Sequence, residues 1–416
     1  NLEYQAFIYH HRVLLEFTLG LTAHILKFNK TIYRDLDMAK TQPNKKSEAV
    51  EETTSSTRRG LLKTGLGAAL IGAPFIRNAQ AAKTTTWKVQ TSWDAGTTGY
   101  KLFEEWAGSF KEKSGGELAI KPFPARSVAA DNSALFDAVR TGVLQAMNPF
   151  TIYWSGKIPA SVFLTSYPAG PDQTSQWDTM FYGLNMLEMT REIFAKKGLF
   201  YVGPIHHDGN IIHSKKSVET LQDLKGMKIR LPGGMVAQVF EKFGVSTTSL
   251  PSSDIYPALE KGTVDAADYV GPAINYDLGF AEVTNYIICA GPPGQTSLYQ
   301  PVDVMDLTVN MRAWKRLSKQ MQTFVEEQVK TYSVYHYVNV QKANSAAMEK
   351  FLSKGTKVQR LSAEEVVQFR KAAVPIWYEW AKKDKDASRI FKLQQDFMLN
   401  PYMGYLTEAD VKGLKL

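Results

Sequence analysis

From residue 83 onward the sequence predicts an α/β protein. The chain has 416 residues, of which 44% are apolar and 12% are aromatic, so it can bury a large core, and its length favours two domains. Short strand-like runs such as TTWKVQTSW (85–93) and ELAIKPFP (117–124) alternate with segments whose apolar residues recur at helical spacing. This alternation of strands and amphipathic helices is typical of α/β architecture.

Each predicted element has its own signal. The helix over 100–116 carries aromatic residues on one face and ends at a Gly-Gly pair. The helix over 251–262 has Ser252 or Ser253 as its N-cap and ends at Gly262. The other predicted strands are 199–207 and 227–231, and the other predicted helices are 132–146, 235–244, 314–348 and 363–382.

Residues 38–82 have the features of an export signal. A twin arginine (Arg58, Arg59) precedes an apolar run, and a small-x-small cleavage pattern follows at 79–81. The Lys-free part of the apolar run, 64–76, is shorter than the roughly 20 residues that a membrane-spanning helix needs. We therefore predict a twin-arginine signal peptide, and a mature protein that is exported to the periplasm.

Residues 1–37 come before this signal and begin without Met. Export signals lie at the true N-terminus, and Met38 opens a polar n-region of plausible length. We therefore expect residues 1–37 to be non-native upstream translation.

Charge and cysteine content narrow the classes of function. The net charge of +8 includes 11 Lys/Arg and 7 Asp/Glu within residues 1–82, so the remainder is close to neutral. No run of basic residues interleaved with aromatics follows Lys83, which argues against a nucleic-acid partner. Cys289 is the only cysteine, so no internal disulfide is possible, and its apolar context favours a buried hydrophobic role over a nucleophile.

One segment carries a family resemblance. Residues 223–272, DLKGMKIRLPGGMVAQVFEKFGVSTTSLPSSDIYPALEKGTVDAADYVGP, resemble the central signature of the solute-binding proteins of tripartite ATP-independent periplasmic (TRAP) transporters, the DctP family. FDAVRTGVLQA (136–146) fits the family's first lobe. The resemblance implies a two-lobed periplasmic solute-binding protein fold with crossing strands, a long connecting helix and a helical C-terminal region. Lobe 1 would span 83–206, lobe 2 would span 207–303, and 304–416 would return to lobe 1.

A second, finer resemblance concerns the ligand. SDIYPALEKGTVDAADYVGP (253–272) and SLYQPVD (297–303) are similar to the branch of this family that binds monocarboxylic 2-hydroxy and 2-oxo acids together with a metal ion. The resemblance implies that the chain is not an enzyme but a receptor, which delivers a small organic acid to two membrane subunits.

Arg230 is the predicted carboxylate clamp. It ends a strand just before Pro232-Gly233-Gly234, at the carboxyl edge where ligands bind in open α/β sheets. Its planar guanidinium matches a carboxylate bidentately, which a lysine would not do. Spacing alone leaves an ordinary surface arginine as the alternative, and the family resemblance favours the clamp.

The resemblance also implies a cation site. Asp268, the main-chain carbonyl of Tyr269 and the side-chain oxygen of Gln300 would hold it, and such oxygen ligands suit calcium or sodium. Gln300 favours a calcium–lactate type, because relatives with sodium and a 2-oxo acid carry Glu there. With Asp268 and Arg230 alone, calcium would be neutralised by two monoanions and sodium by one, so this charge count leaves both pairings open.

Two further residues complete the predicted pocket. Tyr153 matches a family aromatic whose hydroxyl reaches the ligand, and Asn210 matches a polar residue of the interlobe strand, although either side chain also fits a plain structural role. Neighbouring histidines on a strand point to opposite faces, which argues against metal ligation by the group His206, His207 and His213.

The predicted function is capture of lactate with calcium for a TRAP transporter, and three alternatives remain. The first is a pyruvate-like 2-oxo acid bound with sodium. The second is a periplasmic enzyme, although no G-x-S-x-G elbow is present, and Asp265 and Asp268 fall on opposite faces of a strand. The third is a sensor module that presents its ligand to another protein. The aromatic segment VPIWYEWA, with Trp377, Tyr378 and Trp380, would serve either a homodimer contact or packing within the chain.

Overall fold

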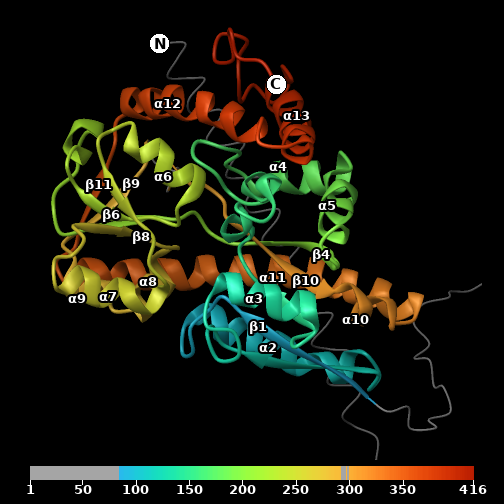
Figure 1. Ribbon diagram of the computed structural model, residues 1–416. Coiled ribbons are helices and arrows are strands. Elements are labelled where there is room, and N and C mark those ends of the chain that lie inside the picture. Colours follow the sequence, from blue (N-terminus) through green and yellow to red (C-terminus); the bar gives the residue numbers. More distant parts are fainter. Residues whose placement is uncertain (1–83, 292–296, 298) are drawn as a thin grey trace, which may run out of the picture. The chain divides into compact units, whose positions relative to one another are not determined.

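The computed structural model describes residues 84–291, 297 and 299–416 (Figure 1). The predicted signal peptide and the upstream segment 1–37 lie outside these residues. Two mixed sheets with helices packed around them confirm the predicted α/β fold class. Within the described part of the chain, no helix is both long enough and apolar enough to cross a bilayer.

The first sheet has the strand order β2-β1-β3-β10-β4. β1 pairs in parallel with β2 and β3, whereas β10 is antiparallel to β3 and β4. The strands are β1 (Thr85–Thr91), β2 (Leu118–Phe123), β3 (Ala146–Asn148), β4 (Leu199–His206) and β10 (Val304–Asn310). The helices that join them are α2 (Thr98–Lys113), α3 (Asn132–Thr141), α4 (Thr174–Asp178) and α5 (Met186–Ala195), with shorter turns η1 (Thr151–Trp154), η2 (Pro159–Phe163) and η3 (Thr179–Gly183).

The second sheet has the order β11-β9-β5-β8-β6-β7. β5 is antiparallel to both of its neighbours, and the other pairs are parallel. The strands are β5 (Ile212–Ser214), β6 (Lys228–Arg230), β7 (Ser246–Thr248), β8 (Ala266–Asp268), β9 (Tyr286–Cys289) and β11 (Lys357–Arg360). Its connecting elements are η4 (Leu221–Leu224), α6 (Gly234–Glu241), α7 (Ser252–Glu260), α8 (Pro272–Asp277) and α9 (Phe280–Val283).

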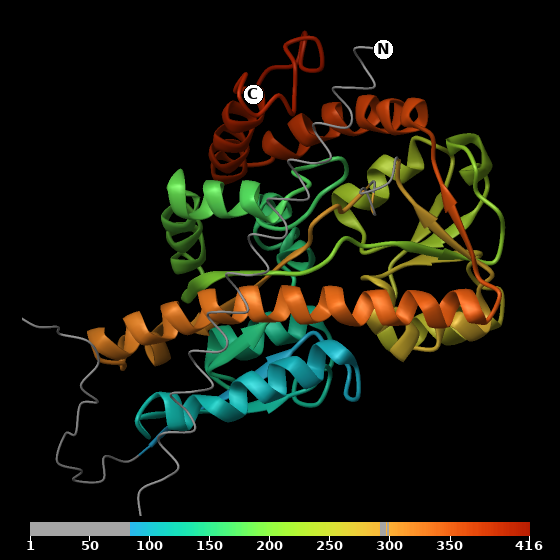
Figure 2. The same ribbon diagram turned by 180° about the vertical axis from the view of Figure 1, so that it is seen from behind.

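The chain crosses between the sheets in two segments that hydrogen-bond to each other. The main-chain amide of His207 donates to Asp303 at 2.8 Å, that of Asp303 donates to Asp208 at 3.1 Å, and that of Asn210 donates to Gln300 at 3.0 Å. The long helix α11 (Lys319–Ser353) contacts β4, α2 and α8, and Figure 2 shows it running past both sheets. Crossing strands and the long helix therefore connect the two halves of the described chain, each of which is built around one sheet.

The C-terminal helices pack within the chain. They are α10 (Met311–Lys315), α12 (Ala363–Ala381) and α13 (Lys385–Leu399), and α12 contacts α6, η2 and α13. Trp377, Tyr378 and Trp380 are 0%, 3% and 6% exposed. The indole of Trp377 donates to the Pro168 carbonyl at 2.9 Å, and that of Trp380 to the Gln238 side chain at 2.9 Å. Of the two roles that the sequence leaves open for these aromatics, the structure shows packing within the chain.

Several element boundaries differ from those that the sequence predicts. The helix expected over 132–146 ends at Thr141, because Gly142 adopts a left-handed conformation with φ 91° and closes it. Pro251 is the N-cap of α7, so Ser252 is its first helical residue and not its cap. β11 lies in the second sheet, so the segment after residue 303 contributes to both sheets.

Asp208 links the crossing segment to the site-bearing half. Its carboxylate accepts from the main-chain amide of Gly271 at 3.0 Å and from the side-chain amide of Asn344 on α11 at 2.5 Å. The Asn344 oxygen in turn accepts from the Ala273 amide at 2.9 Å. These bonds fix the chain directly after β8, next to the predicted ligand residues Asp268, which ends β8, and Tyr269, which follows it.

Gly271→Ala should destabilise the fold. An added Cβ would overlap the Asp208 carboxylate and approach the Asn344 side-chain nitrogen at 2.8 Å, and overpacking of this kind costs about 1–3 kcal/mol. Gly156→Ala is the matched control, since no atom lies within 4 Å of its added Cβ. Urea denaturation measures both variants, and equal unfolding midpoints would refute the role assigned to this contact.

Candidate functional site

A small cavity lies where the crossing segments meet the carboxyl ends of β6 and β8. Its volume of about 20 Å³, counted as the space open to the centres of water molecules, makes it a tight space with room for little more than a water molecule before any side chain moves. The cavity brings all the residues of the predicted site together. Its walls are Phe150, Ile152, Tyr153, Asn210, Arg230, Pro232, Asp268, Tyr269, Val270, Gln300 and Asp303.

Arg230 is held rigidly in this cavity by main-chain carbonyls. Its side chain is buried, with Nε and Nη2 donating to the Leu250 carbonyl at 3.0 and 2.9 Å and Nη1 donating to the Asp268 carbonyl at 2.8 Å. These bonds use three of the five N–H groups of a guanidinium, so at most two remain for a ligand. The Tyr269 ring lies beneath the guanidinium, at 5.5 Å from its centroid.

Asp268 faces Arg230 with one oxygen satisfied and one not. Oδ1 accepts from the Tyr299 hydroxyl at 2.8 Å, whereas Oδ2 has no hydrogen-bond partner and lies 3.7 Å from Nη1 of Arg230. Burial raises the pKa of Asp268 to about 7, although the charge of Arg230 and the Tyr299 hydrogen bond both oppose the shift. Because this buried oxygen makes only a long ion pair and no hydrogen bond, it has capacity for a further cation or donor.

Asn210 and Gln300 add neutral oxygens to the same wall. The Asn210 side-chain nitrogen donates to the Gln300 side-chain oxygen at 3.0 Å, and the Gln300 nitrogen donates to the Ser166 carbonyl at 3.2 Å. The Asn210 side-chain oxygen is buried without a partner. A carboxylate oxygen and two amide oxygens form a donor set that fits a hard cation such as calcium or sodium.

Two phenols line the cavity beside Arg230. Burial raises the pKa of Tyr153 and also that of Tyr269, so both hydroxyls stay protonated at neutral pH. They therefore add hydrogen-bond donors to the cavity and no charge.

Asp303 is a cavity residue that the sequence analysis did not assign to the site. It is 3% exposed, and its Oδ1 accepts from the Thr165 hydroxyl at 2.5 Å and from the Val304 amide at 2.8 Å. Burial raises its pKa to about 6. The sequence did contain an indication of this position, because Asp303 ends the same SLYQPVD motif that contains Gln300.

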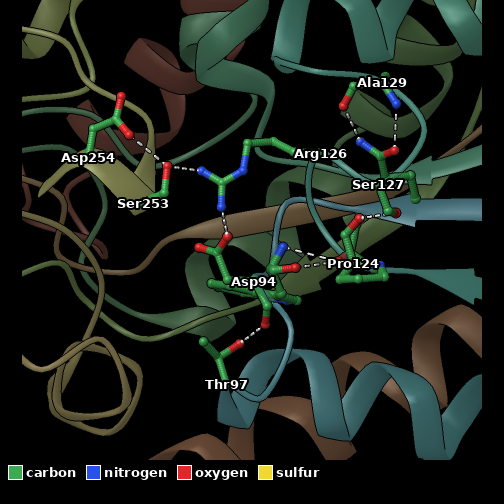
Figure 3. A network of polar contacts seen from close by, with 11 residues as sticks. Asp94, Thr97, Pro124, Arg126, Ser127, Ala129, Ser253 and Asp254 are labelled. Atoms are coloured by element: carbon green, nitrogen blue, oxygen red, sulfur yellow. Dashed lines mark hydrogen bonds and ion pairs between the residues drawn. The ribbon is translucent and has the colours of Figure 1, made fainter. Parts of the chain in front are cut away.

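Arg126 makes a second polar contact between the two halves (Figure 3). Its guanidinium bonds to Asp94, next to the first sheet, and to Ser253 at the start of α7. Asp277 at the end of α8 makes another contact between the two halves. Its carboxylate accepts from the amide and the hydroxyl of Thr98 at 2.7 Å each. These bonds join the halves in the arrangement that encloses the cavity.

The histidines lie outside the cavity wall. His206 contacts the Asp178 carboxylate at 2.7 Å, and His207 lies 2.6 Å from Asp208. Burial lowers the pKa of His213 to about 3, so it is neutral. Among the described residues, no group of three or more His, Cys, Asp or Glu side chains is arranged to hold a metal. The cavity instead presents the carboxylates of Asp268 and Asp303 together with neutral oxygens.

Comparison with protein families gives one match over most of the chain. Residues 89–384 match the family model DctP, described as bacterial extracellular solute-binding protein, family 7. A curated relative, the monocarboxylate 2-oxoacid-binding periplasmic protein of Nostoc sp., is 28% identical over 313 residues, which are 75% of this chain and 83% of the relative.

Solved structures of TRAP periplasmic solute-binding proteins are similar to this fold. The protein from Colwellia psychrerythraea, with bound calcium and pyruvate, has a TM-score of 0.66 at 26% identity and covers 78% of this chain and 99% of its own. The protein from Pseudoalteromonas atlantica, with bound sodium and pyruvate, has a TM-score of 0.67 at 26% identity and covers 80% of this chain and 100% of its own. Calcium and sodium thus both accompany pyruvate among similar proteins.

The raised pKa of Asp268 predicts a pH-dependent stability of the cation-free protein. A carboxyl whose pKa is raised from 3.8 to about 7 stabilises the fold fully below pH 3.8, and this contribution is lost as the pH rises to about 7. Asp268→Asn should flatten that decline, as measured by denaturation in EDTA between pH 4 and 8. Asp265→Asn, whose carboxylate pairs with Lys216 at 2.8 Å outside the cavity, should leave it in place. The same decline in native protein and Asp268→Asn would contradict the assignment.

Proposed function

The chain belongs to the DctP family of bacterial extracellular solute-binding proteins, and from this premise we propose that it captures a small 2-hydroxy monocarboxylate, lactate, in the periplasm. A calcium ion accompanies the acid, and the two membrane subunits of a TRAP transporter receive it. The twin-arginine signal within 38–82 directs export. One observation carries the proposal: a buried guanidinium with N–H groups to spare faces a buried carboxylate oxygen without a partner, inside one small cavity.

Different residues of the cavity wall bind the acid and the cation. Arg230 offers its remaining N–H groups to the carboxylate of the acid. Asp268, Gln300 and the main-chain carbonyl of Tyr269 hold the cation, with the Asn210 oxygen at the same wall. A bound calcium ion supplies positive charge to the acid's carboxylate and its neighbouring oxygen. Tyr153, protonated and beside Arg230, donates to the ligand.

Contacts between the two halves retain the acid. The bonds of Arg126 to Asp94 and Ser253, and those of Asp277 to Thr98, form only when the halves are close together. Closure removes water from the cavity, which strengthens every electrostatic contact to the ligand. The membrane subunits recognise the closed form.

A 2-oxo acid such as pyruvate is the second candidate ligand. The Nostoc relative is named for 2-oxoacids, and the Colwellia and Pseudoalteromonas proteins hold pyruvate with calcium and with sodium. Lactate and pyruvate share the carboxylate and an oxygen on the next carbon, so the same residues serve both. Gln300 favours the calcium–lactate pairing.

An enzyme is the less suitable alternative. The family is one of solute receptors. Cys289 is buried, and burial raises the pKa of its thiol, which makes it a poor nucleophile. A sensor module would close over its ligand in the same way. It would differ from a transport receptor only in the protein that binds its closed form.

Titration calorimetry of the mature protein tests the proposal. Lactate, pyruvate and a C4 dicarboxylate are each titrated with calcium and with EDTA. The expected result is tight binding of lactate that weakens strongly in EDTA, because the cation links Asp268 to the ligand. A preference for the dicarboxylate would contradict the proposal. Lactate binding that is equally tight with calcium and with EDTA would contradict the role of calcium in it.

Arg230→Lys should weaken lactate binding by roughly ten- to a hundredfold while the fold is retained. The substitution keeps the charge but loses the fork, and a charge-assisted bond contributes about 1.5–3 kcal/mol. Arg191→Lys is the matched control, because Arg191 also donates to two main-chain carbonyls, at 3.1 and 2.8 Å, but lies outside the cavity. Equal lactate affinities of Arg230→Lys and the native protein would remove the carboxylate clamp from the account.

A further inference from the structure

Asp303 places a second carboxylate in the wall of the ligand cavity. The residue follows Gln300 on the crossing segment, and its carboxylate is oriented by Thr165 and by the Val304 amide through Oδ1. In the described part of the chain, no lysine or arginine forms an ion pair with it. His207, the nearby imidazole that opposes the rise in its pKa, lies 2.6 Å from a different carboxylate, that of Asp208.

The formal charge of the cavity follows from its walls. Arg230 contributes one positive charge, and Asp268 and Asp303 contribute one negative charge each. The phenols of Tyr153 and Tyr269 stay protonated, and the remaining lining side chains are neutral. The empty cavity therefore has a net charge of −1 when both carboxylates are ionised, which differs from the neutral cavity assumed when only Arg230 and Asp268 are counted.

This charge discriminates between the two cations. A sodium ion and one monocarboxylate leave the cavity at −1, whereas a calcium ion and one monocarboxylate bring it to zero. Two monocarboxylates with calcium again leave −1. An unbalanced charge in a buried, weakly polar site is strongly disfavoured, so only the combination of one divalent cation and one monocarboxylate is balanced.

We propose that Asp303 is the residue that makes this cavity select a divalent cation and a single monocarboxylate, by adding one negative charge to the cavity wall that also holds Arg230 and Asp268. The inference rests on the proposed function and specifies its cation and its stoichiometry. Asp303 needs no direct contact with the cation for this role, because charges that line one buried cavity are weakly screened from each other.

Asp303→Asn isolates the charge from the structure. Asparagine retains an oxygen that can accept from the Thr165 hydroxyl and the Val304 amide, so the local hydrogen bonds are preserved. Asp306→Asn is the matched control, because Asp306 is also buried, lies three residues further along the chain within β10 and accepts from Thr308 at 2.5 Å, but it does not line the cavity. Asp303→Glu keeps the charge and tests whether the charge itself is what matters.

Titration calorimetry at pH 8 measures lactate and pyruvate binding with either calcium or sodium as the added cation. We expect the native protein to bind one acid per chain, about a hundredfold more tightly with calcium than with sodium, and Asp303→Asn to lower this ratio at least about tenfold. Asp306→Asn and Asp303→Glu should keep the native ratio. Metal analysis of each purified protein gives a second readout, with less calcium retained by Asp303→Asn.

The outcomes separate this inference from the proposed function. If the native protein binds neither acid under any condition, the proposed function fails. If the native protein binds an acid equally well with either cation, or binds two acids per chain, the proposed function stands and the role of Asp303 is overturned. This test uses the native protein alone, so it holds even if Asp303→Asn does not fold. An unchanged calcium-to-sodium ratio in a folded Asp303→Asn overturns it as well.

Discussion

The site depends on one buried contact, in which the Arg230 guanidinium faces the Asp268 carboxylate at 3.7 Å without a direct hydrogen bond between them. Neither group satisfies the other. Arg230 is fixed by the carbonyls of Leu250 and Asp268, so its position is set by the ends of two neighbouring strands. Asp268 keeps one oxygen without a partner. Burying two charges in this way is costly unless a ligand completes the arrangement.

The rest of the fold serves to keep this arrangement in place. The Asp208 carboxylate holds the Gly271 amide and the Asn344 side chain, and thereby joins the segment after β8 to the long helix α11. The crossing segments bring Asn210 and Gln300 to the same wall through main-chain bonds. Because the cavity is assembled from both halves, its completeness depends on their closure, to which Arg126 contributes from the outer edge.

The sequence predicts the parts of the site that local patterns determine. Arg230 was identifiable because it ends a strand immediately before a Pro-Gly-Gly turn, and the structure places it beside Asp268 in adjacent parallel strands. Asp303 was missed because its segment has no periodic pattern, and its place beside Asp268 depends on how the strands cross. Trp377 illustrates another limit, since an aromatic helix face has the same pattern whether it packs within a chain or between two chains. The early end of α3 depended on one torsion angle, that of Gly142.

Native mass spectrometry of the protein as purified tests the central claim most directly, because it weighs the cation and the acid together on the intact chain. The account predicts one calcium ion and one small monocarboxylate per chain, and both should be lost together when the protein is dialysed against EDTA. A bound dicarboxylate, or an acid that stays bound after every cation has been removed, would contradict it.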